Sequence, residues 1–159
     1  MVAKRRQDLM AFVPANTDFE RRTRESFARQ GAMGLIGAVL EKVEPGHVEV
    51  SLPFRAELSQ QHGFFHAGML STIADTAGGY AGFTLFPAEG AVLTVEFKLN
   101  LLAAADGERA LAVGQVIRSG RTLTVCHLDV FVEKGGARTH CATGLQTLMC
   151  LIGRTGVNG

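Results

Sequence analysis

The stretch QQHGFFHAGMLSTIADTAGGYAG, residues 60–82, is the most informative segment of this chain of 159 residues. Its second half has the period of a largely apolar helix, which we expect over residues 67–86, with Pro87 ending it. The same stretch carries a carboxylate, Asp75, and several glycines. A glycine inside a helix costs about 1 kcal/mol relative to alanine. The glycines therefore lower the stability of this helix, and their presence needs another explanation.

The glycines lie on the same side of the expected helix as Asp75. At 100° per residue, the positions within about 60° of Asp75 are mostly small: Gly68, Ser71, Thr72, Gly78, Gly79 and Gly82. The opposite side is a conventional core stripe. Such a glycine strip favours close approach by another backbone, a second subunit or a ligand. Asp75 is then either functional or a carboxylate that only accepts hydrogen bonds from nearby hydroxyls or a neighbouring subunit.

The start of this helix is a second candidate feature. Residues His66, Ala67 and Gly68 fall at its N-terminus, where free N–H groups and the helix dipole favour a developing negative charge. A carbonyl oxygen can approach the Gly68 amide closely, as an oxyanion hole requires. His66 and Asp75 lie nine residues apart, about 180° around the helix. A site that uses both ends therefore needs Asp75 to meet the helix start of a partner subunit.

The rest of the chain predicts six strands and one further helix. We expect an amphipathic helix over 16–32, capped by Asn16 or Thr17. Alternating polarity and turn residues predict strands over 35–43, 47–54, 91–102, 108–118, 122–133 and 137–149. The order is helix, hairpin, long helix and four-strand meander. It fits an α+β fold in which an antiparallel sheet of about six strands wraps around the long central helix.

The third of these strands has a regular alternation of apolar and polar residues. One side carries Leu93, Val95, Phe97, Leu99 and Leu101, and the other carries Thr94, Glu96, Lys98 and Asn100. We expect the apolar side to face the core. We divide the chain into an N-terminal extension (1–32), one domain (33–150) and a disordered tail (151–159).

Composition argues against several classes of function. The formal net charge is +1, which favours neither nucleic acid nor an anionic membrane as a partner. No apolar run is long enough to span a bilayer, and the N-terminus lacks the features of a secretory signal. The three cysteines are widely spaced among apolar residues, as expected of reduced, buried thiols in a cytoplasmic protein. No spacing of Cys and His suggests a metal site.

Read together, these residues resemble a known motif. Gln60, Gly63, His66-Ala67-Gly68 and Asp75 have the spacing found in the PaaI-like acyl-CoA thioesterases of the hotdog-fold superfamily. The common form there is Asn or Gln, then six residues on a His-Gly-Gly, then Asp or Glu nine residues after that His. The segments TVEFKLNLL (94–102) and SGRT (119–122) also resemble that family, and the resemblance covers roughly residues 33–150.

Three positions depart from the commonest family pattern. Gln60 stands where many members have Asn, a change that the family tolerates. Ala67 stands where the first glycine is usual, although Gly68 keeps the amide that matters. Gly79 stands four residues after the acid, where some members have a hydroxyl residue that holds the attacking water.

The resemblance implies an acyl-CoA thioesterase that needs no metal or redox cofactor. Its minimal active unit would be a homodimer, paired into a homotetramer. Gly68 N–H would polarise the thioester carbonyl, and the partner subunit's Asp75 would act as general base on water or as nucleophile. Gln60 would orient the water or the thioester, and His66 would brace the loop. The expected substrate and CoA contacts are Gly63, Ala67, Gly79, Ser119, Gly120, Arg121 and Thr122.

Two other functions are compatible with a hotdog domain. A hydratase or dehydratase acting on thioesters is disfavoured, because those enzymes usually pair a catalytic His with an acid at a different spacing. A non-catalytic acyl-CoA-binding module is disfavoured because an acid is present at position 75.

Overall fold

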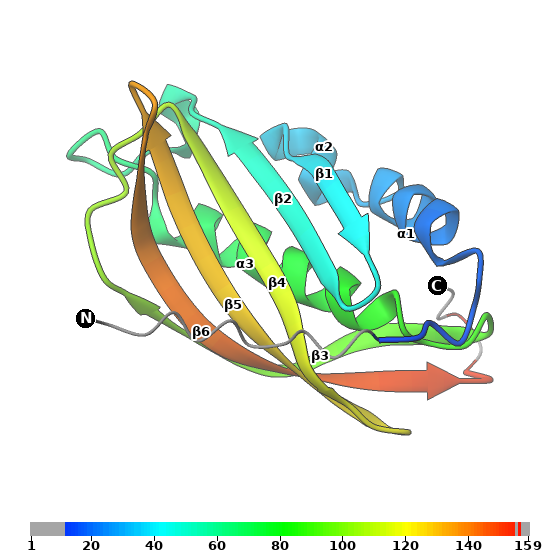
Figure 1. Cartoon of the computed structure of the whole chain (residues 1–159). Coiled ribbons are helices and arrows are strands. Elements are labelled where there is room, and N and C mark those ends of the chain that lie inside the picture. The colour runs from blue at the N-terminus through cyan, green and yellow to red at the C-terminus, as the bar shows by residue number, and fades with distance from the viewer. Residues whose placement is uncertain (1–11, 155, 157–159) are drawn as a thin grey trace, which may run out of the picture.

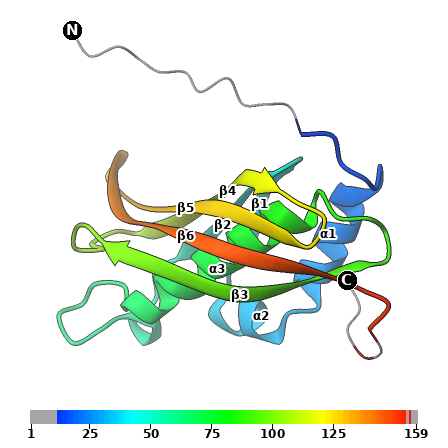
Figure 2. The same cartoon turned by 90° about the horizontal axis from the view of Figure 1, so that it is seen from below.

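A curved antiparallel sheet of six strands wraps around one long helix in the computed structural model, which describes residues 12–154 and 156 (Figure 1). Figure 2 shows the long helix, α3, in the concave side of the sheet. The helices are α1 (Phe19–Ala28), α2 (Gly31–Ile36) and α3 (Ala67–Phe83), with a short 3-10 turn at Ala56–Leu58. The strands are β1 (Val39–Glu44), β2 (His47–Pro53), β3 (Gly90–Leu101), β4 (Arg109–Ser119), β5 (Leu123–Lys134) and β6 (Ala137–Ile152). The expected α+β hotdog architecture is confirmed.

The strand order differs from the expected four-strand meander. The sheet runs β1-β2-β4-β5-β6-β3, so only β4, β5 and β6 form a meander. After α3, the chain enters the sheet at its far edge, where β3 pairs with β6 and not with β4. Among the described strands, one side of β3 is therefore an unpaired sheet edge.

The N-terminal region contains two short helices, where the prediction was a single helix over 16–32. The N-cap residue of α1 is Asp18, and its side chain pairs with Arg21 and does not cap the helix. A second helix, α2, occupies the start of the run that we expected to be a strand, and it ends at Gly37 with φ +76°. The division at residue 32 stays a prediction. The expected tail falls partly on residues 155 and 157–159, outside the described part, and β6 continues to Ile152.

Glycines allow α3 to lie unusually close to its own sheet. A methyl group at Gly78 would lie 2.5 Å from Leu128 Cδ2, and one at Gly82 would overlap Leu148. On the sheet side, a methyl at Gly114 of β4 would lie 2.5 Å from the main-chain N of Gly78. Of the three alternatives for the glycine strip, close approach by another part of the same chain therefore holds at Gly78 and Gly82, and a second subunit does not account for these two glycines. They make room for the sheet of the same chain.

A β-bulge changes which side chains of β3 face the helix. Thr94 pairs with Leu148 and Glu96 pairs with the adjacent Thr147, so Val95 is an extra residue. Thr94 consequently faces α3 with the buried Leu148, although alternation predicted it on the outer side. Of the five residues on the predicted core face, Leu99 is half-buried and packs against the core, as predicted. The other four are exposed: Leu93 46%, Val95 54%, Phe97 42% and Leu101 57%.

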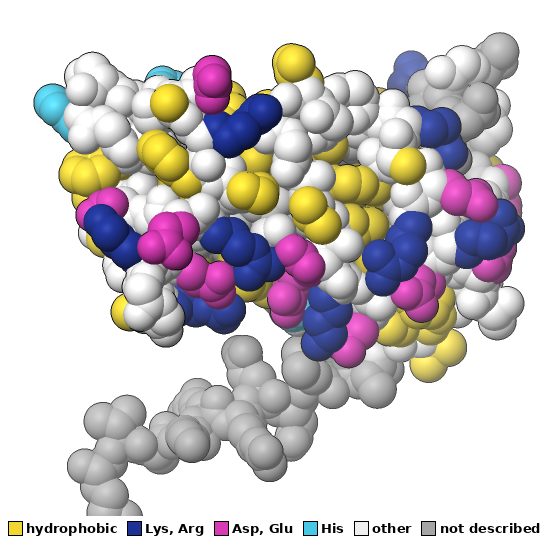
Figure 3. Space-filling view, turned by 90° about the horizontal axis from the view of Figure 1, so that it is seen from above, with side chains coloured by type: hydrophobic (Ala, Val, Ile, Leu, Met, Phe, Trp, Pro, Cys, Tyr) yellow, Lys and Arg dark blue, Asp and Glu magenta, His cyan; other side chains and the backbone are white. Residues whose placement is uncertain are grey.

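One face of the molecule carries charged residues of both signs next to one another, with apolar side chains beside them (Figure 3). Arg109, for example, pairs with Glu41 at 2.7 Å and with Glu133 at 2.9 Å. A surface of mixed sign differs from the basic stripe typical of nucleic-acid binding. Among the described residues, no helix has the length and apolar character needed to cross a bilayer.

The adjacent glycines of α3 provide a matched test of this packing. Gly78→Ala should lower the free energy of unfolding by about 1–3 kcal/mol, because Leu128 and Gln146 must move. Gly79→Ala should raise it by up to about 1 kcal/mol, because a methyl there meets no atom within 4 Å and alanine favours the helix. Urea unfolding of the two variants checks this. Equal effects at both positions would contradict the close contact at Gly78.

The cysteines should differ in reactivity in the folded chain. Burial raises the pKa of the Cys126 thiol to about 12 and that of Cys141 to about 11, whereas Cys150 is only half-buried. At pH 8, only about one Cys126 thiol in ten thousand is then a thiolate. Iodoacetamide followed by mass spectrometry should modify Cys150 first, and Cys126 and Cys141 only after unfolding. Equally fast modification of Cys126 in the folded chain would show that this thiol is accessible and not buried.

Candidate active site

Asp75 lies in the middle of α3, where two side chains from the sheet hold its carboxylate. Thr94 on β3 donates its hydroxyl to Asp75 Oδ1 at 2.7 Å. Gln146 on β6 donates from Nε2 to the same Oδ1 at 2.6 Å and to the Asp75 main-chain oxygen at 3.1 Å. Asp75 therefore does accept a bond from a nearby hydroxyl, as one alternative expected, and it stays half-buried.

Sequence reasoning missed both partners of Asp75. Gln146 is a buried polar residue on β6, two positions from buried Gly144 and two from buried Leu148. A glutamine in that alternating set is a signal that was available, since buried polar groups need partners. Thr94 had no such signal, because the bulge that turns it inward is not visible in the alternation of β3.

A cavity of about 200 Å³ adjoins the Asp75 carboxylate. It lies between α3, β3 and the N-terminal helical segment, and its lining is Gln30, Asp75, Thr76, Gly79, Tyr80, Val92, Leu93 and Thr94. A methyl group at Gly79 would meet nothing within 4 Å. Of the three glycines on this part of α3, only Gly79 thus lines the open space beside the carboxylate.

The N-terminal helical segment forms part of the cavity wall. Gln30, between α1 and α2, donates from Nε2 to the Tyr80 hydroxyl at 3.1 Å, and that hydroxyl donates to Ser26 Oγ at 3.1 Å. Burial raises the pKa of Tyr80, so its hydroxyl keeps its proton at neutral pH. These bonds attach the segment to α3 and place Gln30 in the same cavity as Asp75.

The N-terminus of α3 is capped by its own histidine. His66 is the N-cap residue, and its Nδ1 accepts the Gly68 N–H at 2.9 Å. The candidate oxyanion donor is therefore engaged within the chain, although the His66 side chain is exposed. Gly68 and Asp75 are seven residues apart on α3, which places them about 10 Å apart along the helix axis. One chain does not bring the amide and the carboxylate together.

Gln60 and Gly63 shape the loop that leads into α3. The main chain closes a turn here, with Gly63 N–H donating to Gln60 O at 2.9 Å. Gly63 has φ +81°, which explains the glycine by backbone conformation. The Gln60 side chain accepts the His62 N–H and so faces its own loop.

The four CoA contacts expected in the segment 119–122 lie at the other end of α3. Ser119, Gly120, Arg121 and Thr122 are exposed in the β4–β5 turn, which Gly120 N–H closes by donating to Leu123 O at 2.9 Å. Near this turn, Thr124 lies beside Gly82 in the last turn of α3, whereas Gly68 is in its first turn. Within one chain, the structure keeps these residues apart from the helix start.

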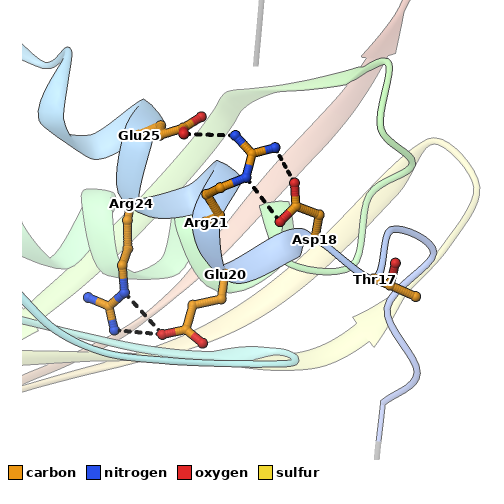
Figure 4. Close-up of a pocket in the computed structure, with 6 residues that line it drawn as sticks. All are labelled: Thr17, Asp18, Glu20, Arg21, Arg24 and Glu25. Atoms are coloured by element: carbon orange, nitrogen blue, oxygen red, sulfur yellow. Dashed lines mark hydrogen bonds and ion pairs between the residues drawn. The ribbon is translucent and has the colours of Figure 1, made fainter.

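A larger hollow, of about 510 Å³, lies on the exposed side of α1 (Figure 4). Its charged residues are paired with one another: Arg21 with Asp18, Arg21 with Glu25 at 2.8 Å, and Arg24 with Glu20 at 2.9 Å. Such pairs at helical spacing are typical of a solvated helix surface. The cavity beside Asp75 remains the better candidate site.

The thioesterase superfamily model matches residues 62–139. A thioesterase family protein from Silicibacter pomeroyi is 47% identical, with a TM-score of 0.84, and the match covers 85% of this chain and 99% of that one. The 1,4-dihydroxy-2-naphthoyl-CoA hydrolase of Escherichia coli is 25% identical over 115 residues, or 72% of this chain and 83% of that protein.

A third protein is similar to this chain in fold alone. The Escherichia coli PaaI protein, from the phenylacetic acid degradation operon, superposes with a TM-score of 0.74 at 16% identity, over 91% of this chain and 98% of that one. The fold and the match to a thioesterase family protein indicate the same family, and Asp75 on the central helix is consistent with it. The chain belongs to the hotdog thioesterase superfamily.

Proposed function

We propose that this protein hydrolyses an acyl-CoA thioester to a carboxylic acid and free CoA, at a site shared by two subunits. The observation that carries the proposal is the Asp75 carboxylate, held beside an open cavity on the central helix of a thioesterase-superfamily chain. A thioester carbonyl is already activated, so one base and one oxyanion donor suffice for its hydrolysis.

The reaction needs two proton transfers, one from water to Asp75 and one from Asp75 to the leaving thiolate. Asp75 accepts a proton from water as the water oxygen bonds to the thioester carbonyl carbon. The negative charge that develops on the carbonyl oxygen is stabilised by the partner subunit's Gly68 N–H. The carbon–sulfur bond then breaks, and the proton on Asp75 passes to the leaving thiolate. Gln60 would orient the water or the thioester.

His66 holds the Gly68 amide in place before substrate binds. Its Nδ1 accepts that N–H at 2.9 Å, at the position where an oxyanion acceptor would lie. We propose that the substrate carbonyl oxygen replaces His66 Nδ1 as the acceptor. Because the His66 side chain is exposed, it can rotate away without disturbing the core.

The free edge of β3 supports a dimer. This strand is 12 residues long and, within the described part of the chain, pairs only on its β6 side. Its exposed apolar side chains include Val95 at 54% and Leu101 at 57%. An unpaired apolar edge of this length is a template for pairing with another strand, and a second copy of β3 is complementary to it. Assembly of such dimers into a tetramer stays a prediction.

The CoA moiety would contact the β4–β5 turn. Arg121 is exposed there, beside Ser119, Gly120 and Thr122, and a guanidinium suits a phosphate group. This assignment extends the family resemblance of the SGRT segment.

Replacing the proposed base tests the activity. Asp75→Asn should lower kcat by about 10²–10⁴-fold, measured as thiol release from a panel of acyl-CoAs. The amide oxygen of Asn can still accept the bonds from Thr94 and Gln146, so the fold should survive. Asp129→Asn, which changes a carboxylate bonded to His140 on the outer sheet face, is the control. Full activity of Asp75→Asn would refute hydrolysis by this site. Tight acyl-CoA binding without hydrolysis by the wild type would indicate a binding module.

Mixing two inactive variants tests the shared site. Gly68→Pro removes the amide donor, and proline is tolerated in the first turn of a helix. Subunits carrying Gly68→Pro or Asp75→Asn should each be inactive alone. Mixed in equal amounts, they should recover roughly a quarter of the wild-type activity, because each heterodimer has one intact site. A site built from one chain would recover nothing, since every chain carries one defect.

A further inference from the structure

Both hydrogen bonds to the Asp75 carboxylate end on the same oxygen. Thr94 and Gln146 donate to Oδ1, and Gln146 Nε2 also lies 3.1 Å from Thr94 Oγ1. The three side chains thus form a closed set in which each touches the other two. Among the described residues, no hydrogen bond reaches Asp75 Oδ2, while Asp75 and Thr94 both line the cavity.

Gln146 is an unfavourable residue for the stability of the fold alone. It is 1% exposed, and its Oε1 has no hydrogen-bond partner among the described residues. That oxygen occupies the space that a side chain at Gly78 would need, so Gln146 also requires a glycine inside α3. A buried amide with one unpaired oxygen is less stable than an apolar side chain of the same shape. The Nε2 group, which faces two oxygens of Asp75, accounts for a glutamine at this place.

Thr94 reaches Asp75 only because of the irregularity in β3. The extra residue Val95 turns Thr94 toward α3. Bulges commonly re-aim a side chain next to an active site. Two independent features, a bulge in β3 and a buried glutamine on β6, therefore converge on one carboxylate oxygen.

We propose that Thr94 and Gln146 are positioning residues, which fix the Asp75 carboxylate through Oδ1 and present Oδ2 to the reacting water. This inference rests on the proposed hydrolysis. In that reaction Oδ2 takes the water proton and returns it to the thiolate. Without the two donors, the carboxylate can rotate about its Cβ–Cγ bond, and the reactive geometry is populated less often.

The Thr94 hydroxyl gives the first test. Thr94→Val keeps the shape of the side chain but removes the donor, and kcat should fall about 10- to 100-fold with KM within about twofold. Thr94→Ser restores the hydroxyl and should recover most of the lost kcat. Thr147→Val removes a hydroxyl that bonds Glu96 on the same pair of strands and is the control. Wild-type kcat in Thr94→Val, or equal loss in Thr94→Val and Thr94→Ser, would overturn the role of Thr94.

Gln146→Met separates positioning from structural support. Methionine matches the length of glutamine and lacks its amide. The variant should unfold at or above the wild-type temperature, because the unpaired Oε1 is gone, yet its kcat should fall about 10-fold or more. A lower unfolding temperature with unchanged kcat would make Gln146 a structural residue and overturn the inference.

The same measurements distinguish failure of this inference from failure of the proposed function. If the wild type hydrolyses no acyl-CoA, the function itself is wrong. If the wild type is active and Asp75→Asn is not, but Thr94→Val and Gln146→Met match the wild type, only the positioning role is wrong.

Discussion

Helix α3 lies so close to the sheet that their main chains touch, and this contact sets the position of Asp75 relative to β6. The main chain of β4 at Gly114 lies directly against the main chain of α3 at Gly78, and neither position has room for a methyl group. Because the helix lies this close, Gln146 on β6 extends past Gly78 and reaches Asp75 on the cavity side. Larger residues at either glycine would push the helix outward and separate that pair. The packing of the core and the geometry of the carboxylate therefore have a common cause.

Much of the fold was predictable because its signals are local. The period of the segment around Asp75 predicted α3, and Pro45-Gly46 between alternating runs predicted the β1–β2 hairpin. The place of β3 at the far edge was not predictable, since strand order depends on where the chain re-enters the sheet after α3. The roles of the individual glycines were not predictable either. A helical wheel identified their shared side, but it does not distinguish Gly78, which contacts the sheet, from Gly79, which faces the cavity.

Some residues of the candidate site were predictable from the sequence and others were not. Asp75 and Gly68 were identified because their spacing on one helix is short and periodic. Thr94 and Gln146 are 19 and 71 residues away from Asp75, and their contact depends on strand register and on one bulge. Register of this kind is set by long-range pairing, which alternation in a single strand does not reveal. The buried position of Gln146 was the only available signal, and it indicates a need for partners without naming them.

The edge strand β3 links the carboxylate to the proposed subunit contact. Thr94 holds Asp75 from this strand, and the neighbouring extra residue, Val95, is 54% exposed at the same point of the edge. If a second copy pairs along β3, it restrains the bulge that turns Thr94 inward. The orientation of Asp75 in one subunit would then depend on the presence of the other. Association would thus supply the partner subunit's Gly68 and also stabilise the orientation of the base that acts with it.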